Sequence, residues 1–240
     1  MLADSEELYT FPMSAIGILN EKPLHASLKT WYAQAGDQFE VPVDGYVIDI
    51  VRDDWLFEIQ TGHFAPLRSK LDALTRTHRV RLIYPVAQEK WIVKQATPPH
   101  DSADRRKSPK RGRVEDLFRE LVSFPHFLAR DNFSIEVLLI REEETRRYVG
   151  RQSWRKRGWR TDGRILLEVV DRQLFESPMN CLDLLPSSLD QAFTTLNLAE
   201  ALGIKRQLAQ KMAYCLREMQ MIQAIGKRKR AVLYEIAHQQ

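Results

Sequence analysis

The apolar and polar positions of the first 94 residues predict helices and strands in alternation. Apolar residues at 24, 28, 31 and 32 have helical spacing, and Pro23 suits the first turn because its missing N–H is not needed there. Short apolar runs beside the Asp44-Gly45 and Asp53-Asp54 turns predict strands. In chain order we expect a helix at 24–35, strands at 39–43, 46–51 and 55–61, a helix at 65–77, and strands at 80–85 and 90–93. This order predicts an α/β (α+β) fold on a mixed sheet.

The pattern changes near residue 97, which we take as the end of a first domain, 1–97. Residues 98–113 are rich in Pro, Ser and charge and show no periodicity, which is typical of a basic linker or exposed loop. Periodic apolar positions return in 114–185, interpreted as a basic α/β middle segment. Its expected elements are helices at 114–121 and 124–129 and a strand at 133–141, and a periodic apolar pattern returns at 165–170 and 172–175.

The last segment, 186–240, begins after the Leu-Leu-Pro stop that ends at Pro186. A short helix at 197–202 ends at Gly203, and a longer helix follows at 205–219. Strands at 221–225 and 231–236 flank a tight basic turn, 226–230. Helix, turn, helix and hairpin together are typical of a winged helix-turn-helix domain.

Composition restricts the class of protein. The chain has 240 residues, 44% of them hydrophobic and 28% charged, which is ordinary for a globular protein. No apolar run approaches the roughly 20 residues that a membrane helix needs, and the acidic N-terminus lacks the apolar core of a signal peptide. Two distant cysteines without a CxxC pair make neither a disulfide scaffold nor a zinc site. We therefore expect a reduced, cytoplasmic protein.

The net charge of +4 is distributed unevenly. Residues 1–100 carry 10 Lys and Arg against 13 Asp and Glu, whereas residues 101–164 carry 17 against 11. Residues 165–240 are nearly balanced, with 9 against 8. A basic stretch beside an acidic domain indicates that one part of the chain meets a polyanion while another does different work.

Carboxylates interrupt two apolar strands of the first domain. Asp49 lies inside Val-Ile-Asp-Ile-Val, where an unpaired carboxylate is costly, and Glu58 and Gln60 share one face of the next strand. An antiparallel pair can bring Asp49 opposite Glu58, where the two charges repel unless a cation lies between them. Such an oxygen site suits Mg²⁺ or Mn²⁺, which activates water and neutralises charge on a scissile phosphate. Solvated strand carboxylates are the simpler alternative.

Residues 14–94 resemble the PD-(D/E)xK nuclease superfamily, with a restriction-endonuclease-like core. The resemblance rests on a helical Glu, an Asp strand, an E-x-K-like strand, a helix and two strands. It implies that Asp49 and Glu58, with the backbone carbonyl of Ile59, bind the metal, and that Gln60 occupies the usual lysine position. Glu21 resembles the additional N-terminal acid of the resolvase-like branch.

The sequence departs from that family at one position. Glutamine replaces the lysine that would orient or polarise the attacking water, and some branches supply that lysine from the following helix. Lys70 lies on that helix here. His63 and His78 flank the same helix, and histidines in such places more often cap or pack than catalyse.

The middle segment has the composition of a nucleic-acid contact. Residues 146–164 carry eight Lys and Arg against one acid, and phosphate neutralisation by such residues gives affinity without sequence specificity. Trp154 and Trp159 would stack on bases or arginines, or else fill the neighbouring core. The basic residues expected at nucleic acid here are Arg151, Arg155, Lys156, Arg157 and Arg160.

In the C-terminal segment, the helix 205–219 is the expected recognition helix, because its apolar residues share one face and leave polar ones outside. Four consecutive cations form the tip of the wing. The residues expected to contact DNA are Lys205, Arg206, Gln207, Gln210, Lys211, Lys227, Arg228, Lys229 and Arg230.

Three interpretations remain open. The first is a Mg²⁺- or Mn²⁺-dependent nuclease that acts on nucleic acid, with DNA as the expected partner, in bacterial repair, restriction or phage defence. The second is an inactive nuclease fold that serves as a DNA-binding regulator or a subunit of a larger complex. The third is an adaptor whose winged helix docks a protein, which the basic wing disfavours. A homodimer is compatible with each, and no membrane partner is expected.

Overall fold

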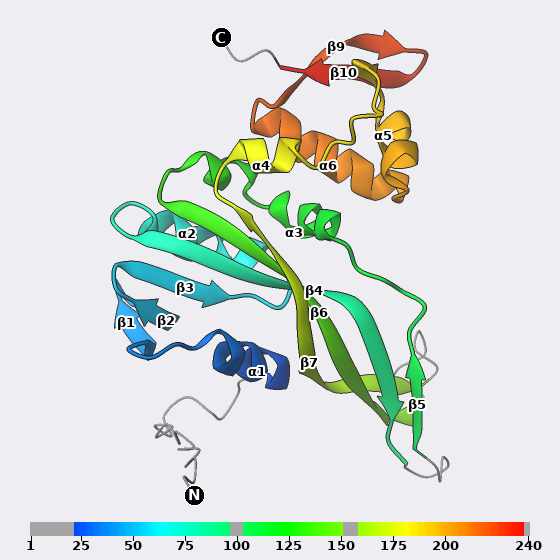
Figure 1. The fold of residues 1–240 in the computed structure, drawn as a ribbon. Helices are drawn as coiled ribbons and strands as arrows, with labels where there is room; N and C mark the ends of the chain where they lie inside the picture. The colour runs from blue at the N-terminus through cyan, green and yellow to red at the C-terminus, as the bar shows by residue number, and fades with distance from the viewer. Residues whose placement is uncertain (1–21, 97–102, 151–157, 238–240) are drawn as a thin grey trace, which may run out of the picture.

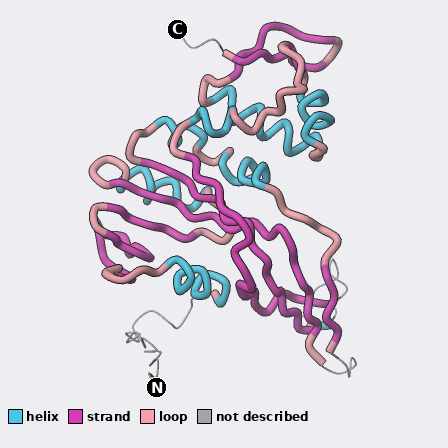
Figure 2. The backbone as a smooth tube through the Cα atoms, in the orientation of Figure 1, coloured by secondary structure: helices cyan, strands magenta, loops and turns pink. Residues whose placement is uncertain are grey.

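The computed structural model describes residues 22–96, 103–150 and 158–237. These residues form a large sheet with helices on both of its faces and a smaller C-terminal sheet beyond a layer of helices (Figure 1). The tube in Figure 2 shows that long strands dominate the lower part of the molecule and that several helices and a strand hairpin lie in the upper part. None of the helices in the described part of the chain has the length and apolar composition that a bilayer crossing requires.

The large sheet is mixed, as the sequence predicts. Its strands follow the order β1-β2-β3-β4-β6-β7, and β5 pairs with part of β4. The pairs β1–β2, β2–β3 and β6–β7 are antiparallel, whereas β3–β4 and β4–β6 are parallel. The strands are β1 (Gln38–Val43), β2 (Tyr46–Arg52), β3 (Trp55–Ile59), β4 (Arg79–Lys94), β5 (Asp104–Lys107), β6 (Phe133–Tyr148) and β7 (Trp159–Phe175).

Helices cover the two faces of this sheet with separate apolar clusters. On one face, Leu24 and Leu28 of α1 (Pro23–Tyr32) pack against residues such as Ile50 and Ile59. On the other face lies the larger cluster, which includes Leu71 and Leu74 of α2 (Arg68–Leu74). Short helices complete that second layer: the 3₁₀ turns Ala65–Leu67, Val114–Leu117 and Pro125–Ala129, and α3 (Phe118–Leu121).

Three strands, β4, β6 and β7, are longer than the local pattern predicts. The strand expected at 133–141 continues to Tyr148, and the segments 165–170 and 172–175 lie in one strand that begins at Trp159. The strands expected at 80–85 and 90–93 are one strand, β4, which pairs continuously with β6 apart from a register shift between Ala87 and Glu89. The polar residues of 86–89 interrupt the apolar pattern, but backbone pairing with β6 continues through them. The segment expected as a linker also contains β5, which pairs with the end of β4.

The C-terminal elements agree closely with the predicted ones. Thr194 caps α5 by accepting a hydrogen bond from the Asn197 N–H, and Gly203 ends that helix with a φ of 63°. The small sheet has the order β8-β10-β9. The elements are α4 (Pro178–Leu182), β8 (Ala192–Phe193), α5 (Thr195–Leu202), α6 (Arg206–Glu218), β9 (Ile222–Arg228) and β10 (Ala231–Ile236).

The C-terminal helices share one apolar core with the large sheet. Met212 and Leu216 of α6 belong to the same cluster as Phe118 of α3. Polar contacts support this packing, because the Lys211 ammonium donates to the Arg119 carbonyl at 2.8 Å and Arg113 donates to the Leu202 carbonyl at 2.7 Å. The boundary predicted at residue 186 therefore lies within one continuous core.

Candidate functional site

Asp49 lies on β2 with its carboxylate directed along the sheet. Its Oδ2 accepts a hydrogen bond from the Ile59 backbone N–H at 2.7 Å and lies 3.1 Å from Nε2 of His25 on α1. The residue is largely buried, with 9% of its surface exposed. Asp49 is thus held by a strand on one side and by a helix on the other.

An irregularity in β2 explains this orientation. Residues two apart on a regular strand share a face, yet Ile48 packs in the cluster of α2 and Ile50 in the cluster of α1. Between the Val41–Ile48 and Phe39–Ile50 pairs, Glu40 of β1 has a φ of 51°, in the left-handed region. The strand therefore rotates at Asp49, and the side chain points toward β3 rather than toward either face.

Glu58 of β3 approaches the same place from the face covered by α2. Its Oε1 accepts a hydrogen bond from the Lys70 ammonium at 2.7 Å, and that ammonium also donates to the Val47 carbonyl at 2.7 Å. The two side chains are mostly buried, at 14% exposed for Lys70 and 12% for Glu58. The second oxygen, Glu58 Oε2, is buried and has no hydrogen-bond partner among the described residues.

The environment opposes ionisation of Glu58. Burial raises the pKa of this carboxyl first, and the Asp49 charge raises it further, to about 7. Lys70 and His25 act in the opposite direction and only partly offset these causes. Two acids thus interact across the β2–β3 junction, and a divalent cation between them would remove the cost of ionising both.

The raised pKa predicts a pH dependence of stability. Native Glu58 binds its proton more tightly than the unfolded chain, so the unfolding free energy of the metal-free protein should fall as the pH rises from 4.5 to about 7. The fall should be no more than roughly 3 kcal/mol. In Glu58→Gln this part of the pH profile should flatten, as measured by urea denaturation in EDTA. Glu176→Gln, at an exposed glutamate, should keep the wild-type profile; parallel profiles for all three proteins would contradict the prediction.

Three of the predicted site residues lie together. The Ile50–Phe57 pair of the antiparallel β2–β3 ladder makes Asp49 and Glu58 the next opposing positions, as the sequence indicates. Lys70 reaches Glu58 from α2. The Gln60 side chain is turned away, because its amide donates to the His63 carbonyl at 2.8 Å. Glu21 lies outside the described residues.

His25 is a site residue that the sequence analysis did not single out. The apolar spacing of the helix 24–35 placed its neighbours Leu24 and Leu28 in the core, but nothing local indicated what the histidine meets. Its partner is 24 positions away along the chain. Of the two histidines considered instead, His78 contacts Asp44 at 2.9 Å and His63 accepts the Gln60 amide through its carbonyl.

The carboxylate pair offers few donors for a metal ion. Across the described ranges, no group of three or more His, Cys, Asp or Glu side chains is arranged to hold a metal ion. The donor set at β2 and β3 is smaller: two carboxylates, one of which has a buried oxygen with no partner in the described chain. Hard oxygen donors of this type fit Mg²⁺ or Mn²⁺.

The basic residues predicted at nucleic acid divide into three groups. Those of the wing, Lys227 to Arg230, are exposed, as are Arg160 on β7 and the residues at 205–207 and 210. Lys211 is half-buried and bonded to the Arg119 carbonyl, so it lies at the junction with α3. The remaining predicted residues, Arg151, Arg155, Lys156 and Arg157, lie outside the described ranges, as does Trp154.

The tertiary structure changes the interpretation of two aromatic residues. Trp159 is 7% exposed, with the Lys94 ammonium 5.0 Å from its ring centre, so it packs rather than offering a stacking surface. Tyr214, in contrast, is 41% exposed on α6, in line with Gln207, Gln210 and Arg217. The spacing of these four positions along the helix was the signal that could have identified this exposed row.

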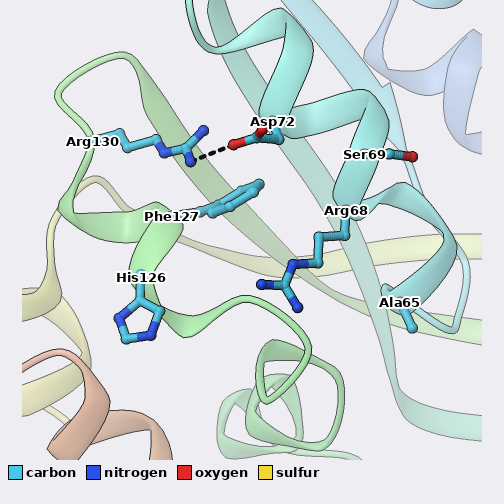
Figure 3. A pocket seen from close by; sticks show the side chains of 7 residues that line it. All are labelled: Ala65, Arg68, Ser69, Asp72, His126, Phe127 and Arg130. Carbon is cyan, nitrogen blue, oxygen red and sulfur yellow. Dashed lines mark hydrogen bonds and ion pairs between the residues drawn. The ribbon is translucent and has the colours of Figure 1, made fainter.

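A separate hollow of ≈ 540 Å³ lies between α2 and the 3₁₀ turn Pro125–Ala129. Figure 3 shows Arg68 extending into it beside His126, and Arg130 bonded to Asp72. The lining consists of Ala65, Arg68, Ser69, Asp72, His126, Phe127 and Arg130.

Comparison with known proteins gives a family without an assigned activity. Residues 22–176 match the model of a family described as a domain of unknown function, DUF8091. A protein of Treponema pallidum (strain Nichols), described as uncharacterized, is 30% identical over 227 residues, which cover 91% of this chain and 86% of the relative. No solved structure matches the chain.

Proposed function

The chain belongs to the family described as domain of unknown function DUF8091, and we propose that it is a metal-dependent nuclease that hydrolyses phosphodiester bonds in DNA. Asp49 and Glu58 would hold Mg²⁺ or Mn²⁺, and Lys70 would stand in for the lysine missing at Gln60. The basic segment and the C-terminal module would hold the nucleic acid.

One observation carries this proposal. A buried carboxylate oxygen without a hydrogen bond is costly, because the group has lost water and gained no partner. Glu58 Oε2 is such an atom, and burial followed by the Asp49 charge raises the pKa of the same carboxyl. A cation bound by both carboxylates would satisfy the oxygen and relieve the repulsion together. Ordinary solvated acids account for neither feature.

The chain's own residues would have distinct tasks. A bound Mg²⁺ or Mn²⁺ would supply Lewis-acid stabilisation of the phosphate and lower the pKa of a water molecule. The Lys70 ammonium donates a hydrogen bond to Glu58, and from that position its positive charge would offset the developing negative charge of the reacting phosphate. His25 and the Ile59 N–H hold Asp49 in one orientation, so little reorganisation is needed when the substrate arrives.

The arrangement of elements supports the same proposal. Part of the element order on which the resemblance to the PD-(D/E)xK nucleases rests is present: the strands that carry Asp49 and Glu58, followed by α2. The two strands expected after that helix form one strand, β4, which is parallel to β3. In the C-terminal module, α5 and α6 followed by a hairpin, with the sheet order β8-β10-β9, support a winged helix-turn-helix. Fold likeness is an analogy, so the site carries the argument.

A cleavage assay tests the proposal. Purified protein is incubated with linear, supercoiled, single-stranded and branched DNA in Mg²⁺, in Mn²⁺ or in EDTA. We expect cleavage with either metal, none in EDTA, and recovery when excess Mg²⁺ is added back. No cleavage of any substrate in either metal would reject a nuclease activity of the chain alone.

The wing gives a separate prediction about DNA affinity. Replacing Lys227 and Arg228 with alanine removes two exposed cations, so affinity near 0.1 M salt should fall about tenfold or more and the salt slope by about 2. The matched control is Arg105→Ala with Lys107→Ala, whose side chains pair with Glu143 and Glu89. Anisotropy titrations over a range of salt measure both variants. Equal losses would show that the wing has no special part in binding.

A binding-only function is the second candidate, and Gln60 is the observation that favours it. The position that usually carries the lysine has no charge, and its amide is engaged with the turn after β3. A DNA-binding regulator would bind DNA through the wing and show no dependence on Asp49 or Glu58. Retained DNA binding without cleavage in the assay above would select this candidate.

A further inference from the structure

We propose that the hollow between α2 and the turn Pro125–Ala129 binds a phosphate group of a nucleic-acid strand, with Arg68 and Arg130 as its donors. The identity of the strand rests on the proposed nuclease function, whereas phosphate binding in the hollow does not. The lining of the hollow includes no residue of the carboxylate site and none of the wing.

Arg68 is the first element of the argument. It is exposed and lines the hollow, and its guanidinium has no hydrogen bond or ion pair with any residue that the structure describes. A guanidinium presents five N–H donors in a planar fork that matches phosphate oxygens. A group of this kind directed into a concave site, beside the exposed ring of His126, is available to an anion.

Arg130 forms a second, preorganised donor on the opposite side. Its guanidinium donates to Asp72 at 2.7 Å, bonds to the Thr75 hydroxyl, and lies 4.0 Å from the centre of the Phe127 ring. These contacts use only part of its five N–H groups and fix its plane. An anion that meets it loses little side-chain entropy, because the side chain is already ordered.

The charges of the lining select an anion. Asp72 is the one carboxylate among the lining residues, and hydrogen bonds from Arg130 and then Arg76 hold its pKa below the usual range. Its negative charge is therefore compensated on two sides. Arg68 remains as uncompensated positive charge within the described chain. Phe127 is 6% exposed, so the face of its ring is not open for stacking on a base, and the guanidinium of Arg68 favours phosphate as the ligand.

The position of α2 relates the hollow to the carboxylate site. Leu71 and Leu74 face the core, and helical spacing places Lys70 on one flank of that buried stripe and Arg68 with Asp72 on the other. The order of the strands agrees with this placement on opposite flanks. Glu58 lies on β3, the turn Pro125–Ala129 leads into β6, and β4 lies between these two strands. A nucleic-acid strand that is held at Glu58 and crosses α2 would present a neighbouring phosphate to Arg68.

The first experiment uses orthophosphate as the probe, in EDTA and at constant ionic strength set with NaCl. Saturating orthophosphate should raise the unfolding midpoint of the full chain by roughly 3 °C. Arg68→Ala should lose this shift, and Arg68→Lys should keep part of it, because charge remains but the fork is lost. Arg79→Ala, the same change at an exposed arginine outside the lining, should respond like wild type. Equal shifts in wild type and Arg68→Ala, or no shift in wild type, would overturn the proposal.

The second experiment identifies the source of the phosphate. Short single-stranded oligonucleotides with a 5′-phosphate or a 5′-hydroxyl are titrated by anisotropy in EDTA. If the hollow binds the phosphate at the end of a strand, the oligonucleotide with a 5′-phosphate should bind about fivefold or more tightly than the one with a 5′-hydroxyl, a difference on the order of one charge contact. Arg68→Ala should remove this preference. An internal site predicts equal affinities that both fall in Arg68→Ala. Affinities that Arg68→Ala leaves unchanged would overturn the assignment to nucleic acid.

Because both experiments exclude metal, their outcome is independent of catalysis. Phosphate binding that depends on Arg68, without any cleavage in the metal assay, would leave the hollow established and reject the nuclease. Metal-dependent cleavage, together with an orthophosphate-induced shift of the unfolding midpoint that is equal in wild type and Arg68→Ala, would support the nuclease and reject the phosphate site in the hollow.

Discussion

Asp49→Asn and Glu58→Gln should each reduce metal-dependent DNA cleavage by a factor on the order of 100 or more. Loss of a group that only supports a metal ligand already lowers metal affinity or activity by roughly 10- to 100-fold, and these two variants change the proposed ligands themselves. Both changes keep the size of the side chain and remove its negative charge. In Asp49→Asn the new amide oxygen would still accept the Ile59 N–H, so the loss should reflect the metal site and not the fold.

The control for this experiment is Asp54→Asn. Asp54 lies in the turn between β2 and β3, and its side chain is 66% exposed, so the same chemical change occurs one turn away from the site. Cleavage and DNA affinity are measured for all three variants, with thermal unfolding as a check on folding. Full activity in Asp49→Asn or Glu58→Gln would place catalysis elsewhere.

Lys90→Met should destabilise the protein by about 3–5 kcal/mol, because it leaves a buried charge without its main partner. The Glu142 side chain is 1% exposed on β6, and its Oε1 lies 2.7 Å from the Lys90 ammonium on β4. Arg164, at 3.6 Å from the other oxygen, would remain as a weaker partner, which favours the lower half of that range. Chemical denaturation at pH 7 measures the loss.

Two companion variants test the reason for this effect. Lys107→Met removes an equivalent lysine whose side chain is 49% exposed and whose partner Glu89 keeps Arg111 and Arg141, so it should cost at most about 1 kcal/mol. Adding Glu142→Gln to Lys90→Met removes the unpaired charge and should recover part of the loss. A double variant as unstable as the sum of its single variants would show that the ion pair is not the cause.

The candidate site shows where local patterns suffice. The carboxylates interrupting apolar strands identified Asp49 and Glu58, and the helix after them identified Lys70, because each signal lies within a few residues. His25 gave no such signal, since its role depends on a contact with β2 that the sequence does not display. Gln60 lies beside Glu58 in sequence, yet the turn after β3 takes its amide.

The lengths of the strands and the packing of the basic segment show the same difference between what local patterns predict and what tertiary contacts decide. The alternation of apolar and polar residues predicted strands on both sides of residues 86–89. β4 continues through these residues because its backbone pairs with β6. Basic composition predicted a polyanion contact around Trp159, while packing beneath Lys94 decides that this ring is buried.

The sequence by itself determined the first helix and the strands after it, the C-terminal helices and hairpin, and the places of Asp49 and Glu58 on adjacent strands, because periodicity, turn residues and caps act over a few positions. The tertiary structure decided the rotation of β2 at Asp49, the buried unbonded oxygen of Glu58, the hollow beside Arg68 and the single core shared by α6 and the large sheet. Each of these depends on groups far apart in the chain, whose burial and charge act on one another only after folding has brought them together.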